Sequence, residues 1–147
     1  WIPVLLIVVF VLKRKDLLPL IISAFAISTL IVQGIKSIVF PEVERPTKAI
    51  ADSSLIHAVS GIDVHTIGSF PSGHTATAFC IYFIFCLLLP KKWWIWVGLM
   101  YALNVGYSRV YLAQHFPLDV AGGIIAAIIA VYCSVKIQQR WMKRNNG

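Results

Sequence analysis

Residues 17–35 read LLPLIISAFAISTLIVQGI, and none of these 19 residues carries a charge. A helix of this length measures roughly 28 Å, close to the hydrocarbon thickness of a bilayer at ~30 Å. Basic residues bound the stretch on both sides, with Lys13-Arg14-Lys15 before it and Lys36 after it. The stretch therefore predicts a transmembrane helix.

The composition extends this prediction to the whole chain of 147 residues, which is 59% hydrophobic and only 13% charged. A soluble domain of this size cannot bury so much apolar surface, whereas a helical membrane protein exposes it to lipid. We predict an all-α, polytopic transmembrane bundle that forms one domain over residues 1–147. The further spans expected are 71–89, 93–107, 117–135 and a partial one at about 1–12, which suggests that the sequence begins inside a helix.

The basic residues indicate how the bundle is oriented. If each span crosses once, one side receives nine of the 13 Lys and Arg residues, namely Lys13, Arg14, Lys15, Lys91, Lys92, Lys136, Arg140, Lys143 and Arg144. By the positive-inside rule this side is cytoplasmic. The net charge of +7 thus reflects topology rather than nucleic-acid binding. The four histidines and five of the six acidic residues fall on the outer side, which carries the polar loop between residues 36 and 70.

The tetrapeptide Pro71-Ser72-Gly73-His74 opens the span 71–89. The first N–H groups of a helix lack partners and favour an anion. Ser72 can add a hydroxyl donor, Gly73 lets a phosphate approach the backbone, and His74 can exchange a proton with a bound group. The alternative is a capped helix whose histidine touches lipid headgroups.

A second motif runs from Ser108-Arg109 to Asp119. Arginine binds phosphate oxygens through two parallel hydrogen bonds. His115 is followed by Asp119 in the first turn of the next helix, and a carboxylate there can orient the imidazole as a nucleophile. The alternative is an interfacial salt bridge between Arg109 and Asp119.

A third group of cations lies between Lys36 and Pro46. Lys36 and Arg45 can stabilise a transferring phosphoryl group. Alternatively, Lys36 only extends to the membrane surface and Arg45 is a loop cation. Lys48 is a second candidate for the lysine role.

The three segments together resemble the type 2 phosphatidic acid phosphatase superfamily of membrane lipid phosphatases. That pattern is a lysine followed by Arg-Pro, then Pro-Ser-Gly-His, then Ser-Arg with a histidine six residues after the arginine and an aspartate four further on. The last two parts are complete here. The first departs, because eight residues separate Lys36 from Arg45 where the family usually has six. The resemblance implies a six-helix core, of which the N-terminal part is missing here.

The resemblance also implies a role for each motif residue. His115 would attack phosphorus, Asp119 would orient His115, and His74 would protonate the leaving oxygen. The phosphoryl oxygens would be held by Lys36, Arg45, Ser72, Gly73 and Arg109. Neither a metal nor another cofactor is expected.

The predicted function is metal-independent hydrolysis of a lipid phosphate or diphosphate through a phosphohistidine. Undecaprenyl diphosphate is the preferred substrate; the alternatives are phosphatidylglycerophosphate, lipid A phosphates and phosphotransfer to a second lipid. A non-enzymatic alternative is a lipid-binding scaffold. We expect a bacterial inner membrane, with the site on the outer side. Loop histidines His57 and His65 have no assigned role.

Overall fold

The computed structural model describes residues 13–50, 66–89 and 93–145. The elements in chain order are a short 3₁₀ helix η2 (Lys15–Leu17), α2 (Leu18–Gly34), a π-helix η3 (Ile35–Val39), α3 (Pro46–Ala49), α4 (Gly73–Leu88), α5 (Trp93–Tyr111) and α6 (Pro117–Asn145). No strand is found in these three ranges, and the all-α prediction is confirmed. The partial span 1–12, Lys91, Lys92, His57 and His65 lie outside the described residues.

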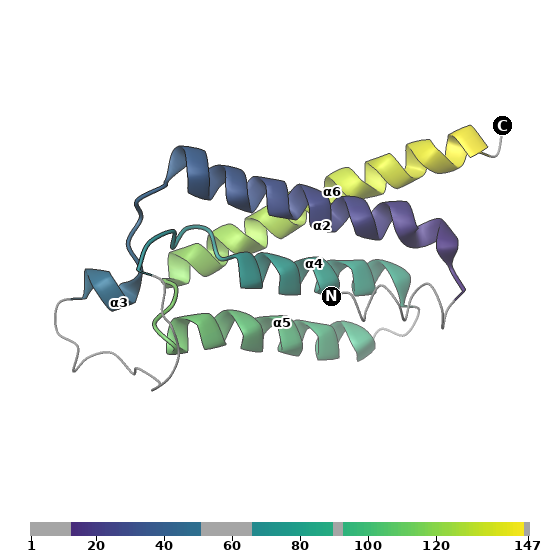
Figure 1. The fold of residues 1–147 in the computed structure, drawn as a ribbon. Coiled ribbons are helices and arrows are strands. Elements are labelled where there is room, and N and C mark those ends of the chain that lie inside the picture. Colours follow the sequence, from purple (N-terminus) through teal and green to yellow (C-terminus); the bar gives the residue numbers. More distant parts are fainter. Residues whose placement is uncertain (1–12, 51–65, 90–92, 146–147) are drawn as a thin grey trace.

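The helices form an elongated bundle (Figure 1). Helix α4 packs between α2 and α5, and α6 crosses α2 and α4. The C-terminal ends of α2 and α5 meet the N-terminal ends of α4 and α6 at one end of the bundle, next to α3. We call this the site end. It collects the three motifs, because each of them lies where a helix begins or ends.

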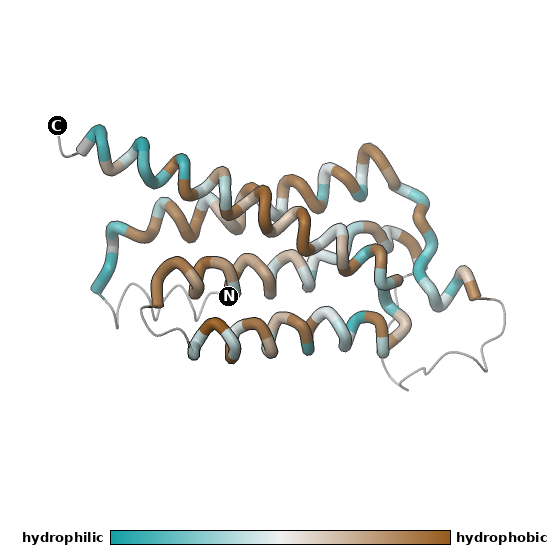
Figure 2. Tube along the Cα trace, turned by 180° about the vertical axis from the view of Figure 1, so that it is seen from behind, coloured by the Kyte–Doolittle hydropathy of each residue, from teal (hydrophilic) through white to brown (hydrophobic). Residues whose placement is uncertain are grey.

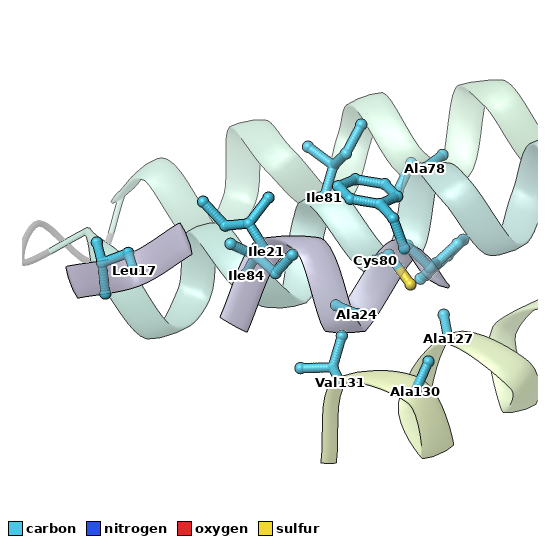
Figure 3. Packing of buried hydrophobic residues seen from close by; sticks show 13 residues of the cluster. Leu17, Ile21, Ala24, Ala78, Cys80, Ile81, Ile84, Ala127, Ala130 and Val131 are labelled. Carbon is cyan, nitrogen blue, oxygen red and sulfur yellow. The ribbon is translucent and has the colours of Figure 1, made fainter. Parts of the chain in front are cut away.

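Small side chains allow α2, α4 and α6 to approach closely (Figure 3). Ala24 of α2, Cys80 of α4, and Ala127 and Ala130 of α6 are all fully buried. Such residues favour helix association where hydrophobic burial gives little driving force, as in a bilayer. Ala126 of α6 is buried as well, at 2% exposed.

The helices of the bundle consist largely of hydrophobic residues (Figure 2), and many large apolar side chains are exposed. Among the described residues, two helical stretches are long and apolar enough to cross a membrane, Leu18–Val39 and Pro117–Arg144. Helix α4 is also apolar, but it has 16 residues. Many large apolar side chains of α5 are exposed, including Trp96, Met100 and Tyr107. An apolar surface of this extent suits a lipid environment.

Two helices extend beyond the expected spans. Helix α5 continues to Tyr111 rather than residue 107, and therefore carries Ser108 and Arg109 in its last turns. Helix α6 continues to Asn145 rather than residue 135. The polar residues after position 135 include Gln, Arg and Lys, whose helix propensity is similar to that of Leu and Met. This polar end of α6 forms the hydrophilic extension near the C-terminus in Figure 2.

Candidate active site

A short antiparallel contact organises the site end. The N–H of Arg45 donates to the carbonyl of Thr66 (2.9 Å), and the N–H of Ser69 donates to the carbonyl of Val43 (3.1 Å). We call residues 66–69 the connecting segment. It brings Arg45 beside the start of the Pro71–His74 motif, although about 25 residues separate them in sequence.

A cavity of about 750 Å³ opens at the site end between α2, α4 and α5. Six of the eight predicted site residues line it: Lys36, Arg45, Gly73, His74, Arg109 and His115. Ser72 and Asp119 are not among the lining residues, because both are buried behind it. Residues from each of the three motifs therefore line the cavity.

Lys36 and Arg45 are held by main-chain carbonyls. Lys36 Nζ donates to the carbonyl of Gly68 (2.8 Å), and Arg45 Nε donates to that of Ile67 (3.1 Å). Burial lowers the pKa of the Arg45 guanidinium, while the nearby Asp119 carboxylate raises it. Neutral carbonyls fix the positions of these two cations without cancelling their charge.

Arg109 is held in a similar way, and Gln114 connects it to Arg45. Arg109 Nη1 donates to the side-chain carbonyl of Gln114 (3.3 Å), and Arg109 Nε donates to Ser108 Oγ (3.2 Å). Arg45 Nη1 reaches the main-chain carbonyl of Gln114 (3.4 Å). Within the described ranges, neither arginine nor Lys36 forms an ion pair. Because no carboxylate pairs directly with these three cations in the described residues, the cavity is suited to an anion.

Lys36 lines the cavity despite the unusual spacing to Arg45, and the π-helix η3 lies in this interval. A π-turn closes over five residues instead of four, and here the N–H of Phe40 donates to the carbonyl of Ile35 (2.9 Å). The wider turn takes up one residue more than an α-helical turn, which is part of the longer interval after Lys36. Lys48, by contrast, pairs with Glu44 (2.7 Å) on the surface and does not line the cavity.

The end of α5 directs His115 toward the cavity. Ala113 has a left-handed backbone conformation (φ 51°), and its N–H donates to the carbonyl of Val110 (3.0 Å). The N–H groups of Gln114 and His115 both donate to the carbonyl of Arg109 (3.0 and 3.2 Å). This is a Schellman-type C-terminal turn. It turns the chain back, so that His115 lies beside the last turn of α5.

Asp119 caps the start of α6. The N–H of Phe116 donates to Asp119 Oδ2 (2.8 Å), and the N–H of Asp119 donates to the carbonyl of Phe116 (2.9 Å). These reciprocal bonds resemble a capping box, and the helix dipole favours a carboxylate in the first turn. The hydroxyl of Ser69 donates to the same oxygen.

Asp119 Oδ2 lies 3.4 Å from His115 Nδ1, and the two side chains are 4% and 2% exposed. Nδ1 has no hydrogen-bond partner within the described residues. The distance is longer than a hydrogen bond of good geometry, and catalytic hydrogen bonds in empty sites often shorten when substrate binds. Because Nδ1 faces the carboxylate, Nε2 is the nitrogen available to the cavity.

Ser72 and His74 lie together at the start of α4, but Ser72 is buried and His74 is exposed. Ser72 Oγ accepts from the N–H of Thr75 (3.4 Å) and from its hydroxyl (2.9 Å), so this fully buried serine caps α4. Its side chain therefore lies away from the cavity, unlike the sequence-based expectation of a phosphate contact. His74 is exposed in the first turn, and it lines the cavity with Gly73.

Close packing of α6 fixes the Pro71–His74 motif against Asp119. The N–H of Ser72 donates to the main-chain carbonyl of Asp119 (2.9 Å). A Cβ at Gly123 would lie 2.5 Å from the carbonyl oxygen of Ser72, and one at Gly122 would lie 2.5 Å from the ring of Phe70. Only glycine at these two positions permits this approach.

The sequence did not point to the connecting segment or to Gln114. Residues 66–68 act through main-chain carbonyls, which any residue type supplies. Only Gly68 could have been singled out from the sequence, because a glycine often marks a backbone turn with positive φ. Its φ is +69° here.

The fold and the site together define an all-α protein with a cationic cavity beside a histidine–aspartate pair. The chain belongs to the PAP2 superfamily, whose family profile matches residues 17–143. The expected resemblance is therefore confirmed.

Three similar proteins illustrate this relationship. An undecaprenyl-diphosphatase of Sulfolobus acidocaldarius is 32% identical over 140 residues, which cover 94% of this chain and 63% of that protein. The bacitracin transport permease protein BcrC of Bacillus licheniformis is 42% identical over 62 residues, which cover 42% of this chain and 30% of that protein. The chain thus spans about one third to two thirds of these relatives. The crystal structure of Aquifex aeolicus LpxE has a TM-score of 0.67 and 33% identity, with 90% of this chain and 74% of that chain covered.

Proposed function

We propose that this chain is the catalytic part of a membrane lipid phosphatase that works through a phosphohistidine. The observation that carries the proposal is the group of three cations without ion-pair partners in the described residues. Lys36, Arg45 and Arg109 line one cavity with His115, and Asp119 lies behind that histidine. Cations fixed in advance stabilise the charge of a transferring phosphoryl group.

In the first step, Nε2 of His115 attacks phosphorus and the bond from phosphorus to the leaving oxygen breaks. His74 donates its proton to that oxygen. Asp119 keeps the imidazole oriented through Nδ1 and stabilises the positive ring that forms. The three cations bind the other phosphoryl oxygens.

In the second step, water attacks the phosphorus of phosphohistidine and the P–N bond breaks. His74, now neutral, accepts the proton of the water, which restores both histidines and releases inorganic phosphate. The exposed position of His74 supports this double use, because the leaving oxygen of the lipid and the water must reach it in turn.

We propose that this chemistry needs no divalent metal, because the three protein cations supply the positive charge. EDTA should then leave phosphate release unchanged. Vanadate should inhibit, because it forms a five-coordinate analogue of the transferring group. Strong inhibition by EDTA, reversed by one metal, would replace this mechanism with a metal-dependent one.

We propose a lipid diphosphate, and undecaprenyl diphosphate in particular, as the substrate. Below the cations the cavity is lined by apolar side chains, including Ala78, Ile81 and Val105. This part suits the first segment of a hydrocarbon chain. The similarity to an undecaprenyl-diphosphatase supports the choice. Phosphatidylglycerophosphate and lipid A phosphates offer the same reacting group and are the alternatives.

The test is a phosphate-release assay on the full-length natural protein in detergent, with undecaprenyl diphosphate, phosphatidylglycerophosphate and lipid A. The proposal predicts fastest release from the diphosphate. Radiolabel appearing on a second lipid instead of inorganic phosphate would indicate a phosphotransferase. Absence of both release and labelled phosphohistidine with every lipid would favour a lipid-binding scaffold.

We further propose that the site end faces outward from a bacterial cytoplasmic membrane. The start of η2, just after Lys13 and Arg14, and the last turn of α6, which holds Lys143 and Arg144, lie at the opposite end of the bundle (Figure 1). This arrangement is in accord with the positive-inside rule. Glu42 is exposed at the site end. A Glu42→Cys variant should react with a membrane-impermeant maleimide in intact spheroplasts; protection there and labelling only after lysis would reverse the orientation.

A further inference from the structure

Ser69 lies outside the three motifs, yet it contacts the centre of the site. Its hydroxyl donates to Asp119 Oδ2, and the residue is fully buried. Within the described residues, its side chain forms this one hydrogen bond. Among the described residues, the Ser69 hydroxyl thus binds only the Asp119 carboxylate.

Asp119 Oδ2 is crowded by three groups that together fix its position. Ser69 Oγ and the N–H of Phe116 both donate to it, and His115 Nδ1 lies 3.4 Å away. A carboxylate can rotate about its terminal bond unless donors hold it in place. Two donors on one oxygen keep that oxygen, rather than Oδ1, directed at the imidazole.

The backbone on each side of Ser69 is itself fixed. The N–H of Ser69 donates to the carbonyl of Val43, and the N–H of Ser72 donates to the main-chain carbonyl of Asp119 (2.9 Å). The same short segment supplies the carbonyl of Gly68 to Lys36. The hydroxyl therefore belongs to a segment that is fixed by hydrogen bonds and that also binds Lys36.

We infer that Ser69 is a positioning residue for His115, acting through Asp119. It directs Oδ2 at Nδ1, so that Nε2 points at the phosphoryl group. The kinetic part of this inference depends on the proposed function, whereas the orientation of the imidazole does not.

The kinetic test compares Ser69→Ala with Ser134→Ala in the full-length protein. Ser134 is an equally buried serine, but its hydroxyl donates to the carbonyl of Ala130 within α6 (2.7 Å). Ser69→Ala should lower kcat roughly 10- to 100-fold with KM changed less than twofold, because only the orientation of the nucleophile is lost. Ser134→Ala should keep both constants. An unchanged kcat in Ser69→Ala would overturn the inference.

A double-mutant cycle separates positioning from general loss of structure. In an Asp119→Asn background, Ser69→Ala should have less than a threefold further effect on kcat. The carboxylate through which Ser69 orients His115 is already absent in that background. Independent, multiplying losses would show that Ser69 acts on the fold rather than through Asp119.

An NMR measurement tests the orientation without turnover. The Nδ1–H resonance of His115, assigned by its absence in His115→Ala, should shift or disappear in Ser69→Ala and stay in place in Ser134→Ala. An unchanged resonance in Ser69→Ala overturns the inference whether or not the protein is active. If the resonance shifts and no lipid is hydrolysed, the proposed function fails while the positioning by Ser69 stands.

Discussion

The two histidines that line the cavity have opposite surroundings. His115 is 2% exposed, follows a hydrogen-bonded turn and faces a carboxylate that is itself held by two donors. His74 is exposed in the first turn of α4. The nucleophile side of the cavity is thus buried and rigid, and the acid side is open.

The proposed chemistry gives a reason for this difference. A nucleophile attacks phosphorus along one line, so a small misplacement is costly. A general acid must follow a leaving oxygen and then exchange protons with water, which needs access more than rigidity. Each of the following changes acts on one side of the cavity.

The largest effect is expected from removing the buried histidine. His115→Ala should lower phosphate release by about 10,000-fold for every substrate, because no other nucleophile replaces Nε2. It should also abolish radiolabelled phosphohistidine, with helix content by circular dichroism unchanged. Substantial turnover in this variant would move the nucleophile elsewhere.

Asp119→Asn keeps the shape of the side chain but removes its charge. It should lower kcat roughly 1,000-fold, because the amide neither stabilises the positive ring nor selects the productive tautomer. Asp16→Asn is the matched control: Asp16 pairs with Arg14 (2.9 Å) at the far end of the bundle, so its rate should equal that of the natural protein. Equal rates for both variants would refute the orienting role.

His74→Ala tests the open side through the leaving group. The loss should be about 100- to 1,000-fold for a lipid monoester, whose alkoxide needs a proton, and less than tenfold for p-nitrophenyl phosphate. The ratio of the two kcat/KM values is the measurement. An equal loss on both substrates would mean that His74 acts on binding rather than as an acid.

A smaller effect is expected at the lysine end of the site. Lys36→Met should raise KM about tenfold, because Lys36 lines the cavity and contributes charge there. Lys48→Met should change KM less than twofold, since Lys48 pairs with Glu44 on the surface. A larger rise in KM for Lys48→Met than for Lys36→Met would assign the lysine role to Lys48.

The smallest effect concerns the turn that carries His115. Ala113 holds a positive φ at the end of α5. Ala113→Gly removes that strain and should stabilise the protein by about 0.5–1 kcal/mol, seen as a rise of roughly 2–4 °C in the thermal midpoint. The rate should be unchanged if hydrogen bonds alone hold the turn. A lower kcat would show that the restricted backbone of alanine also helps to hold His115 in position.

Much of the fold and site follows from the sequence, but not all of it. Uncharged apolar runs predict helices, and the spacing from Arg109 through His115 to Asp119 predicts which side chains meet at their ends. The burial of Ser72 is not predictable in this way, because a serine before a helix can either cap it or face a ligand. Nor is the contact between Ser69 and Asp119, which depends on residues 50 positions apart in the chain.

The π-helix after α2 changes how the lysine–arginine spacing is to be interpreted. Counting residues suggests that Lys36 is two positions out of register with Arg45, yet both side chains line the same cavity. A wide turn takes up additional chain without displacing the charge at its start. The interval between these two cations can therefore be longer than six residues while both charges still line one cavity. Searches for related proteins will find more of them if this interval is left variable.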